Sequence, residues 1–327
     1  MAMRTEGNMT ACRKKIPVLI DCDPGHDDAV ALMLAFGCGA LDVLGVTVVA
    51  GNQTLPKTFK NALKVLSLIG ADVEVAAGAE RPILRSLTVA PNVHGETGLD
   101  GPTLPEPTLR GSSRSAFELI TDTLRRAEKK VTLIPTGPLT NIAIALLACP
   151  DIKAKIERIV LMGGAAYGGN WTPAAEFNIY VDPEAARVVF EAGIPLTMIG
   201  LDVTHKALML PDEVEAMRNS GKIGRVVAEL MDFYSIFYRE RQGFGGLPIH
   251  DACAVSAVFD PTIVTTKHLH VDIETHGEFT AGRTVVDFAG VTGKPANAAV
   301  ALDIDRERFI GHLFRAVEAL ESGLQAR

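Results

Sequence analysis

Apolar runs of strand length alternate with helical stretches through most of the chain. Residues 16–20 and 41–50 are almost wholly apolar, and the segments that follow them, 27–36 and 56–69, have the spacing of helices. Runs without polar alternation are typical of parallel strands that are buried on both faces. Strands that alternate with helices predict a parallel sheet. We therefore expect an α/β fold with an open, mostly parallel central sheet flanked by helices.

The later segments extend this pattern. Ser115 and Glu118 resemble a capping box and predict a helix that runs to about residue 129. The proline-rich connection before it, 78–113, has a length typical of functional lids, and a solvated loop or an interface segment is the alternative. Further strands are predicted at 73–76, 131–134, 158–162, 196–199 and 297–302, helices at 141–148, from 183, at 211–219, 224–240 and the C-terminus, and a small strand pair at 271–276 and 283–288.

We predict a single domain at 16–327, preceded by a flexible leader at 1–15, because the sequence shows no internal repeat, low-complexity segment or clear linker. The leader carries basic residues but no apolar core, so it does not resemble a secretory signal. The longest apolar runs are shorter than the roughly 20 residues that a membrane-spanning helix needs. The five cysteines lack CxxC or zinc spacing and are typical of reduced, buried thiols. These features favour a cytoplasmic protein.

Composition narrows the class of ligand. The net charge of −7 argues against a nucleic-acid partner, which normally requires a basic surface. A hydrophobic content of 47% is enough for a sizeable core in a chain of 327 residues. We therefore expect a globular protein whose partners are small molecules, without nucleic acid or membrane.

Acidic residues gather where the first strand ends. Asp21, Asp23, Asp27 and Asp28 lie within eight residues, and a Pro-Gly turn leads from the strand into the next helix. In open α/β sheets, ligands bind at this edge. Carboxylates this close raise one another's pKa unless a cation or a set of hydrogen-bond donors compensates them. Helix capping is the alternative for Asp27 or Asp28 taken singly, but the four acids together favour a bound divalent metal.

Other polar side chains are predicted to reach the same edge. Asn52 follows the second strand, where an ordinary turn residue is the alternative. Residues 135–141 form a turn with available carbonyl groups, because its prolines cannot donate hydrogen bonds. Glu176 and Asn178 are two residues apart, so in an extended segment they would point the same way, with the residue between them opposite. A His-Asp pair at 250–251 opens another helix, where a cap is again the alternative.

These residue types favour hydrolysis of a sugar derivative. Carboxylates and backbone carbonyls are ligands for Ca²⁺ or Mg²⁺, and the absence of a His and Cys cluster argues against zinc. A water activated by such a cation and by a spare aspartate attacks at neutral pH. Asn52, Glu176 and Asn178 suit a polyhydroxylated substrate. Sugar transfer to water passes through an oxocarbenium-like state, which nearby carboxylates stabilise.

With these motifs the chain resembles the inosine-uridine preferring nucleoside hydrolase family over roughly residues 16–260. The resemblance implies that residues 16–327 form one catalytic domain with Ca²⁺ bound at the strand ends. It also implies hydrolysis of ribonucleosides such as inosine, uridine or cytidine to ribose and free base, a role in nucleoside salvage, and a homotetramer or dimer. The motifs, in the family's order, are Asp21-Cys22-Asp23-Pro24-Gly25-His26-Asp27-Asp28-Ala29, Val49-Ala50-Gly51-Asn52, His94-Gly95-Glu96-Thr97-Gly98-Leu99, Thr136-Gly137-Pro138-Leu139-Thr140-Asn141, Met162-Gly163-Gly164, Glu176-Phe177-Asn178 and His250-Asp251.

The resemblance implies a role for each matching residue. Asp23 would take the proton from the attacking water, and Asp21 would steady the turn behind the metal ligands. The calcium ligands would be Asp23, Asp28, the main-chain carbonyl of Thr136 and Asp251. The ribose would be bound by Asp27, Asn52, Met162, Glu176 and Asn178.

The residues at the base end follow less directly from the motifs. His250 would protonate a purine leaving group, and Tyr238 matches a family position near the base. Tyr234 lies four residues earlier on the same helix face, and core packing is the alternative for this pair. His94 falls in a loop that flanks the base pocket. His26 stands where many relatives carry a hydrophobic residue, and we expect it to face the rim of the site.

Two other functions fit parts of the sequence. The segment Asp21-Cys22-Asp23 after a strand resembles the nucleophile pair of haloacid dehalogenase-type phosphohydrolases, but Pro24 stands where that family has Gly-Thr. A non-catalytic calcium- or sugar-binding module would lack a spare carboxylate base and a histidine near the pocket. Assay of a ribonucleoside panel discriminates among the three functions.

Overall fold

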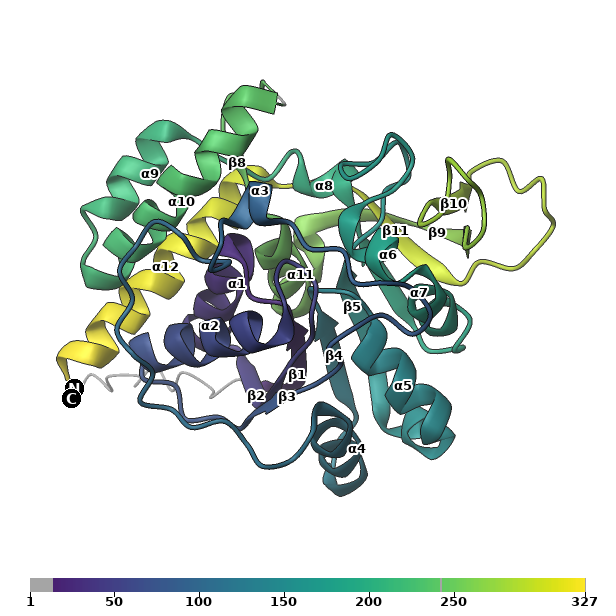
Figure 1. Ribbon diagram of the computed structural model, residues 1–327, viewed down its shortest axis with the longest axis horizontal. Helices are drawn as coiled ribbons and strands as arrows, with labels where there is room; N and C mark the ends of the chain where they lie inside the picture. Colours follow the sequence, from purple (N-terminus) through teal and green to yellow (C-terminus); the bar gives the residue numbers. More distant parts are fainter. Residues whose placement is uncertain (1–13, 242, 327) are drawn as a thin grey trace, which may run out of the picture.

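The computed structural model describes residues 14–241 and 243–326, and its centre is a nine-stranded sheet (Figure 1). The strands are β1 (Ile16–Cys22), β2 (Leu41–Val48), β3 (Val75–Ala77), β4 (Val131–Pro135), β5 (Ile156–Met162), β6 (Leu196–Ile199), β9 (Val264–Ile273), β10 (Thr284–Asp287) and β11 (Ala298–Ile304). Their order is β10-β9-β11-β6-β5-β4-β1-β2-β3. The pairs from β3 to β11 are parallel, whereas β9 runs antiparallel to both β11 and β10. This confirms the predicted fold class.

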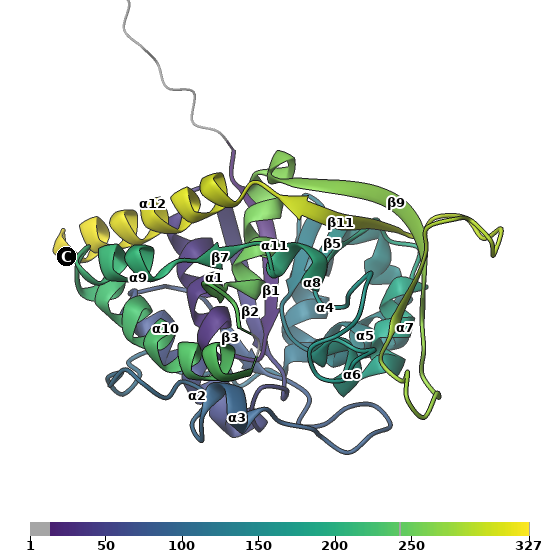
Figure 2. The ribbon, with the colours of Figure 1, turned by 90° about the horizontal axis from the view of Figure 1, so that it is seen from above.

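Helices cover both faces of this sheet. Figure 2 shows α12, α9 and α10 on one side of β1 and β2, and α5 and α7 on the other. The short strands β7 (Leu208–Met209) and β8 (Leu247–Pro248) form a separate antiparallel pair. The helices are α1 (His26–Gly37), α2 (Leu55–Leu68), α3 (Pro91–His94), α4 (Ala116–Arg126), α5 (Thr140–Ala148), α6 (Phe177–Val181), α7 (Pro183–Phe190), α8 (Leu201–Thr204), α9 (Pro211–Arg218), α10 (Lys222–Arg241), α11 (His250–Phe259) and α12 (Arg306–Gln325), with 3-10 turns at Pro150–Lys155 and Pro261–Ile263.

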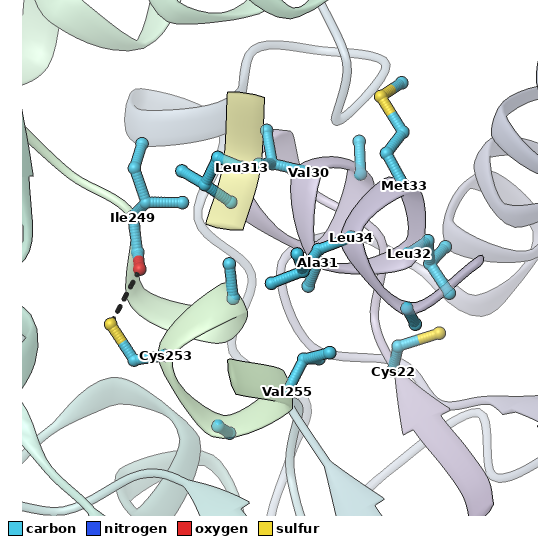
Figure 3. Close-up of a cluster of buried hydrophobic side chains, with 14 of the residues drawn as sticks. Cys22, Val30, Ala31, Leu32, Met33, Leu34, Ile249, Cys253, Val255 and Leu313 are labelled. Atoms are coloured by element: carbon cyan, nitrogen blue, oxygen red, sulfur yellow. Dashed lines mark hydrogen bonds between the residues drawn. The ribbon is translucent and has the colours of Figure 1, made fainter. Parts of the chain in front are cut away.

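The helices α1 and α11 lie inside the core. Ten consecutive residues of α1, from His26 to Ala35, are buried, and so are nine residues of α11. A helix that is apolar all round has no face to present to water and packs between other elements. Figure 3 shows side chains of α1 such as Val30 and Leu34 beside those of α11 and Leu313 of α12. This packing fixes where the first turns of α1 and α11 lie.

The strand pair near the C-terminus is larger than the sequence pattern indicates. Strand β9 begins at Val264, and it pairs with β11, so it extends the main sheet. Its residues Thr265 to His268 are exposed, and such a polar stretch lacks the apolar pattern from which we predicted strands. The 78–113 connection contains the short helix α3. The capping box of Ser115 and Glu118 is present at the start of α4, as predicted.

The structure tests only part of what we predicted for the leader, the domain organisation, the cysteines and membrane-spanning segments. The predicted leader lies almost entirely outside the described residues, and the single domain stays a prediction. Cys22 and Cys253 are buried, Cys38 and Cys149 are partly buried, and all four carry free thiols. None of the helices in the described part of the chain has the length and apolar character needed to cross a membrane.

Candidate active site

The candidate site lies at the carboxyl ends of β1 and β4, where the strand order of the sheet changes direction. From β1, the chain adds β2 and β3 on one side and β4, β5 and β6 on the other. Ligands of open α/β sheets bind at such a switch point. A pocket at this edge is lined by Asp27, Asn52, Ala90, Val93, His94, Thr136, Met162, Asn170, Trp171, Glu176, Phe177, Asn178, Tyr234, Phe237, Tyr238, His250 and Asp251.

Three carboxylates meet at the pocket because two buried helices begin there. Asp27 and Asp28 lie in the first turn of α1, and Asp251 lies in the first turn of α11. Oxygen atoms of these three side chains lie within 4.8 Å of one another, and all three residues are buried. Carboxylates are favoured at helix N-termini, but the macrodipole contributes only about 0.3–1 kcal/mol for each. That contribution is small beside the cost of burying three neighbouring charges.

Hydrogen-bond donors surround Asp28. Its Oδ2 accepts from the backbone N–H of Gly25 at 3.0 Å and from Nδ2 of Asn52 at 3.1 Å. Its Oδ1 accepts from the hydroxyl of Thr136 at 2.9 Å. The turn after β1, the loop after β2 and the loop after β4 are therefore joined through one carboxylate.

The carboxylate of Asp23 is half satisfied. Its Oδ2 accepts from the backbone N–H of Asn52 at 2.6 Å, whereas its Oδ1 is buried and has no hydrogen-bond partner within the described part of the chain. A Cβ atom at Gly51 or Gly137 would clash with this carboxylate, so the backbone of both loops approaches it closely. A buried, unpaired carboxylate oxygen is costly unless another group binds it.

The pKa values reflect this burial. Loss of water raises the pKa of Asp21 to about 7, and the same cause together with the charge of Asp28 raises the pKa of Asp27 to about 8. Burial and neighbouring carboxylates raise the pKa of Asp23 and of Asp251 well above their usual range. Oxygen-only donors, an orphaned carboxylate oxygen and the need for positive charge fit a hard divalent cation such as Ca²⁺.

Asp21 lies behind this group. Its Oδ1 accepts from the hydroxyl of Thr47 at 2.5 Å and from Nδ2 of Asn141 at 2.8 Å, so it joins β1 to β2 and α5. Its Oδ2 is buried without a hydrogen-bond partner among the described residues. These bonds hold the end of β1 in place beside its two neighbours.

On the other side of the pocket, Asn178 joins two strand ends. Its Nδ2 donates to the main-chain carbonyl of Thr136 at 2.7 Å and to that of Met162 at 3.3 Å. A carbonyl oxygen has two lone pairs, so the Thr136 carbonyl retains capacity for a second partner. The Met162 side chain lines the pocket beside these groups.

Glu176 occupies a different local structure from the one predicted. The segment is not extended: Glu176 is the N-cap of α6, and its carboxylate accepts from the backbone N–H groups of Gly164, Asn178 and Ile179. Phe177, predicted to point away, also lines the pocket. Burial raises the pKa of Glu176 to about 7 despite these donors. The predicted alternation of side chains holds only in an extended segment. Here the backbone changes from extended to helical at Glu176, so the side chains that follow are arranged as in a helix.

Hydroxyl and imidazole groups of α8, α10 and α11 form a hydrogen-bonded chain beside the pocket. The Tyr238 hydroxyl lies 2.8 Å from Nε2 of His250 and 3.1 Å from the Tyr234 hydroxyl. Nδ1 of His250 lies 2.7 Å from the Thr204 hydroxyl. Burial lowers the pKa of His250 well below its usual range, and it raises the pKa of both tyrosines. Both ring nitrogens of His250 thus have protein partners, and the tyrosine hydroxyls extend the chain into the pocket.

His94 lines the pocket, and His26 lies behind it. The prediction that His26 faces the rim was wrong, because this residue is completely buried in the first turn of α1. Burial lowers the pKa of His26 to about 4 and that of His94 well below its usual range, so both rings are neutral at neutral pH. His26 lies at the start of the buried helix α1, so it is in the core, like the hydrophobic residue that many relatives carry at this position.

The structure brings the predicted site residues together. All of them line the pocket except Asp23 and Asp28, which contact the pocket residue Asn52. The sequence did not identify the other residues of the lining, because periodic patterns do not show which loop and helix residues far apart in the chain meet at the pocket. These are Ala90, Val93, Asn170, Trp171, Phe177 and Phe237.

Comparison with known proteins agrees with this geometry. Residues 18–311 match the family model "Inosine-uridine preferring nucleoside hydrolase". The chain is 52% identical over 297 residues to the pyrimidine-specific ribonucleoside hydrolase RihA of Shewanella sp. (strain ANA-3), covering 90% of this chain and 93% of that protein. It is 50% identical over 298 residues to RihA of Escherichia coli O1:K1 / APEC, covering 90% and 96%.

Solved structures also resemble the chain closely. A purine-preferring ribonucleoside hydrolase from Gardnerella vaginalis superposes with a TM-score of 0.87 at 34% identity, covering 93% of this chain and 99% of that one. An inosine-guanosine nucleoside hydrolase superposes with a TM-score of 0.86 at 31% identity, covering 92% and 98%. The sheet and the helices around the pocket are therefore shared with these enzymes.

We expect the metal-free protein to lose stability as the pH rises. Aspartates in an unfolded chain ionise near pH 4, whereas the folded pKa values of Asp21 and Asp27 are about 7 and about 8. Between about pH 4 and pH 8 the folded protein therefore binds more protons than the unfolded chain. The contribution of these two aspartates to the free energy of unfolding is complete below about pH 4 and is lost as the pH rises through about 8. A divalent cation held by these carboxylates would favour their ionised forms, so added Ca²⁺ should raise the melting temperature more at about pH 8 than at about pH 5. Thermal unfolding with and without Ca²⁺ measures both effects.

A matched pair of variants localises the effect. Asp28→Asn should lose most of the calcium-induced rise in melting temperature. Asp272→Asn, at an acid that pairs with Lys294 on the surface of β9, should retain it. A rise that is equal at both pH values, or equal in both variants, contradicts the assignment of the cation to this cluster.

Proposed function

The chain belongs to the inosine-uridine preferring nucleoside hydrolase family and is a ribonucleoside hydrolase, an enzyme that acts on N-glycosyl bonds; we propose that Ca²⁺ and Asp23 assist this hydrolysis to ribose and free base. The observation that carries the proposal is the buried acidic cluster, in which Asp27, Asp28 and Asp251 lie within 4.8 Å. Such a cluster costs stability unless a cation compensates it. The phosphohydrolase and binding-module alternatives lose their support, because the whole family pattern matches.

The proposed calcium ligands are Asp23, Asp28, the Thr136 carbonyl and Asp251. The orphaned Oδ1 of Asp23 and the spare lone pair of the Thr136 carbonyl support this set. Asp27 lies close enough to share the cation, and its place in the pocket lining also suits contact with ribose. When bound, Ca²⁺ supplies the charge that keeps these carboxylates ionised and lowers the pKa of a neighbouring water.

Asp23 is the proposed base. With Oδ1 toward the cation, Oδ2 accepts one hydrogen bond from the Asn52 backbone N–H and keeps a lone pair that can accept the proton of the attacking water. Its carboxylate is buried between the backbones of Gly51 and Gly137, which approach it closely. A base that is fixed in this way is already oriented when substrate binds.

Polar groups on both sides of the pocket suit a ribose. Asp27 of the acidic cluster would accept a hydrogen bond from the 2′-hydroxyl side of the ring, and Asn52, which contacts Asp28, would donate one to it. Glu176 and Asn178 would bind the 5′-hydroxyl side, with Met162 against the sugar face. The carboxylates then surround the position where positive charge develops on the ribose, and they stabilise the oxocarbenium-like transition state.

The hydroxyl and imidazole chain is proposed to serve the leaving base. His250 is neutral at rest; it would take one proton from solvent and pass a proton through Tyr238 and Tyr234 toward the base, returning to the neutral imidazole, because these hydroxyls continue the hydrogen-bond chain that begins at Thr204. The proton that the base receives neutralises the negative charge that develops on the base when the glycosidic bond breaks. His94, whose ring stacks on Tyr234, would contact the base beside these hydroxyls.

We propose pyrimidine ribonucleosides as the preferred substrates, because relatives about half identical to this chain are named pyrimidine-specific. Inosine is the second candidate, and one observation favours it: the chain from His250 to Tyr234 offers a proton to a base that leaves poorly as an anion. A cytoplasmic location and a homotetramer or dimer stay predictions.

The first test is a panel of ribonucleosides. With Ca²⁺ present, we expect release of ribose from uridine and cytidine, with a higher kcat/KM than from inosine. A reducing-sugar assay with chromatography of the free base measures both products. Cleavage of phosphate esters without release of any base would refute the proposed reaction, and a higher kcat/KM for inosine would reverse the proposed preference.

The second test concerns Asp23. Asp23→Asn should reduce kcat by about a thousandfold, since removal of a positioned base costs about 10²–10⁴-fold and a metal ligand is weakened as well. Circular dichroism should show an intact fold, because the amide is nearly isosteric with the carboxylate. Asp212→Asn, at an exposed acid in the first turn of α9, is the matched control and should keep normal kcat. Near-normal turnover by Asp23→Asn would exclude it as the base.

A further inference from the structure

We propose that His26 is a positioning residue for base recognition: its backbone and ring hold His94 so that Nε2 of His94 faces the base end of the pocket. This inference rests on the proposed function, because it requires a nucleobase at that end. His26 itself does not line the pocket, so it acts only through His94.

The contacts of His26 fix both edges of its ring. Nε2 lies 2.8 Å from the carbonyl oxygen of Asp100, which only accepts, so this nitrogen carries a proton. On the opposite edge, Nδ1 lies 3.1 Å from Nδ1 of His94. The backbone N–H of His26 donates to Nδ1 of His94 at 3.2 Å, so the proton of the neutral His94 ring lies on Nε2. The two Nδ1 atoms share no proton, so His26 holds the inner nitrogen of His94 through its backbone N–H. Its ring, which is held by the Asp100 carbonyl, positions the His94 ring by stacking.

Aromatic rings hold the pair from its sides. The His26 ring stacks on Phe233 of α10 with a centroid distance of 5.2 Å and an interplanar angle of 2°. Tyr234 stacks on both histidines, with centroid distances of 5.6 Å to each. The tyrosine that we place near the base is thus in the same stack as His94. A shift of either histidine ring would disturb the packing at the base end.

The turn that carries His94 is itself fixed to its neighbours. Nδ2 of Asn61 donates to the carbonyls of Pro24 and Thr97. These bonds join α2 to the turn before α1 and to the turn after α3. Nε2 of Gln53 donates to the carbonyl of Gly95 at 2.9 Å. These bonds hold the backbone of the turn. His26 then restricts the orientation of the His94 ring.

The backbone at Gly25, just before α1, packs closely against His94 and Asn52. A Cβ atom at Gly25 would lie 2.5 Å from Nδ1 of His94 and 2.9 Å from Nδ2 of Asn52. His94 therefore packs against the backbone that leads into α1. No hydrogen bond joins Nε2 of His94 to the residues that the structure describes, and this nitrogen is the one that can meet a polar edge of the base.

A double-mutant cycle tests the coupling. His26→Phe keeps an aromatic ring in the stack and removes both ring nitrogens. His94→Ala should lower kcat/KM for uridine by about ten- to hundredfold, as loss of a hydrogen bond to the base predicts. His26→Phe should lower it at least about fivefold in the wild-type background and less than about twofold in the His94→Ala background, because coupled residues are not additive.

A second readout separates positioning from general loss of structure. Product inhibition by D-ribose should keep its inhibition constant in His26→Phe, because ribose makes no contact at the base end. His312→Phe, at a partly buried histidine of α12 that lies 3.4 Å from Asp260, is the matched control and should change kcat/KM less than about twofold in either background. If His26→Phe unfolds below the assay temperature, His26→Gln replaces it in the same cycle.

The outcomes are distinct. Equal losses from His26→Phe in both backgrounds, or a matching loss of ribose inhibition, overturn the positioning role. Normal kcat/KM in His94→Ala overturns the base contact on which it depends. Failure of the wild-type protein to release ribose from any ribonucleoside refutes the proposed function instead.

Discussion

Burial of several carboxylates at one edge of the sheet is the constraint on which the rest of the structure depends. Asp23, Asp28 and Asp251 have lost their water, and their pKa values are raised for that reason. The hydrogen bonds from Gly25, Asn52 and Thr136 satisfy part of the group, but Oδ1 of Asp23 has no partner within the described residues. We interpret the whole arrangement as a ligand set made for a cation, and the loops around it as the means of holding that set in register.

The core explains how acids so far apart in sequence come together. The helices α1 and α11 are buried along their length and pack on each other, so their first turns must lie side by side. Helix α1 brings Asp27 and Asp28 to the cluster and places His26 against His94, and helix α11 brings Asp251 to the cluster and His250 to the pocket. Small errors in helix packing would therefore displace the metal ligands and the base contacts together, which links stability of the core to activity.

Much of the fold and the site was predictable, for identifiable physical reasons. Buried parallel strands leave apolar runs, and acids at their carboxyl ends mark the edge where ligands bind, so the stretch from Asp21 to Asp28 was informative alone. The sequence could not show that Glu176 caps α6, that His26 is buried, or that Trp171 and Val93 line the pocket. Those facts depend on contacts between distant loops, for which the chain carries no periodic signal.

Calcium binding by metal-free protein tests the central claim most directly. Isothermal titration calorimetry of the chelator-treated chain with Ca²⁺ should show one site per chain, with proton release that depends on the ionisation of the buffer. The same titration of Asp251→Asn should show much weaker binding. Absence of binding to the wild-type protein, or equal binding by the variant, would contradict the claim that the buried carboxylates form a cation site.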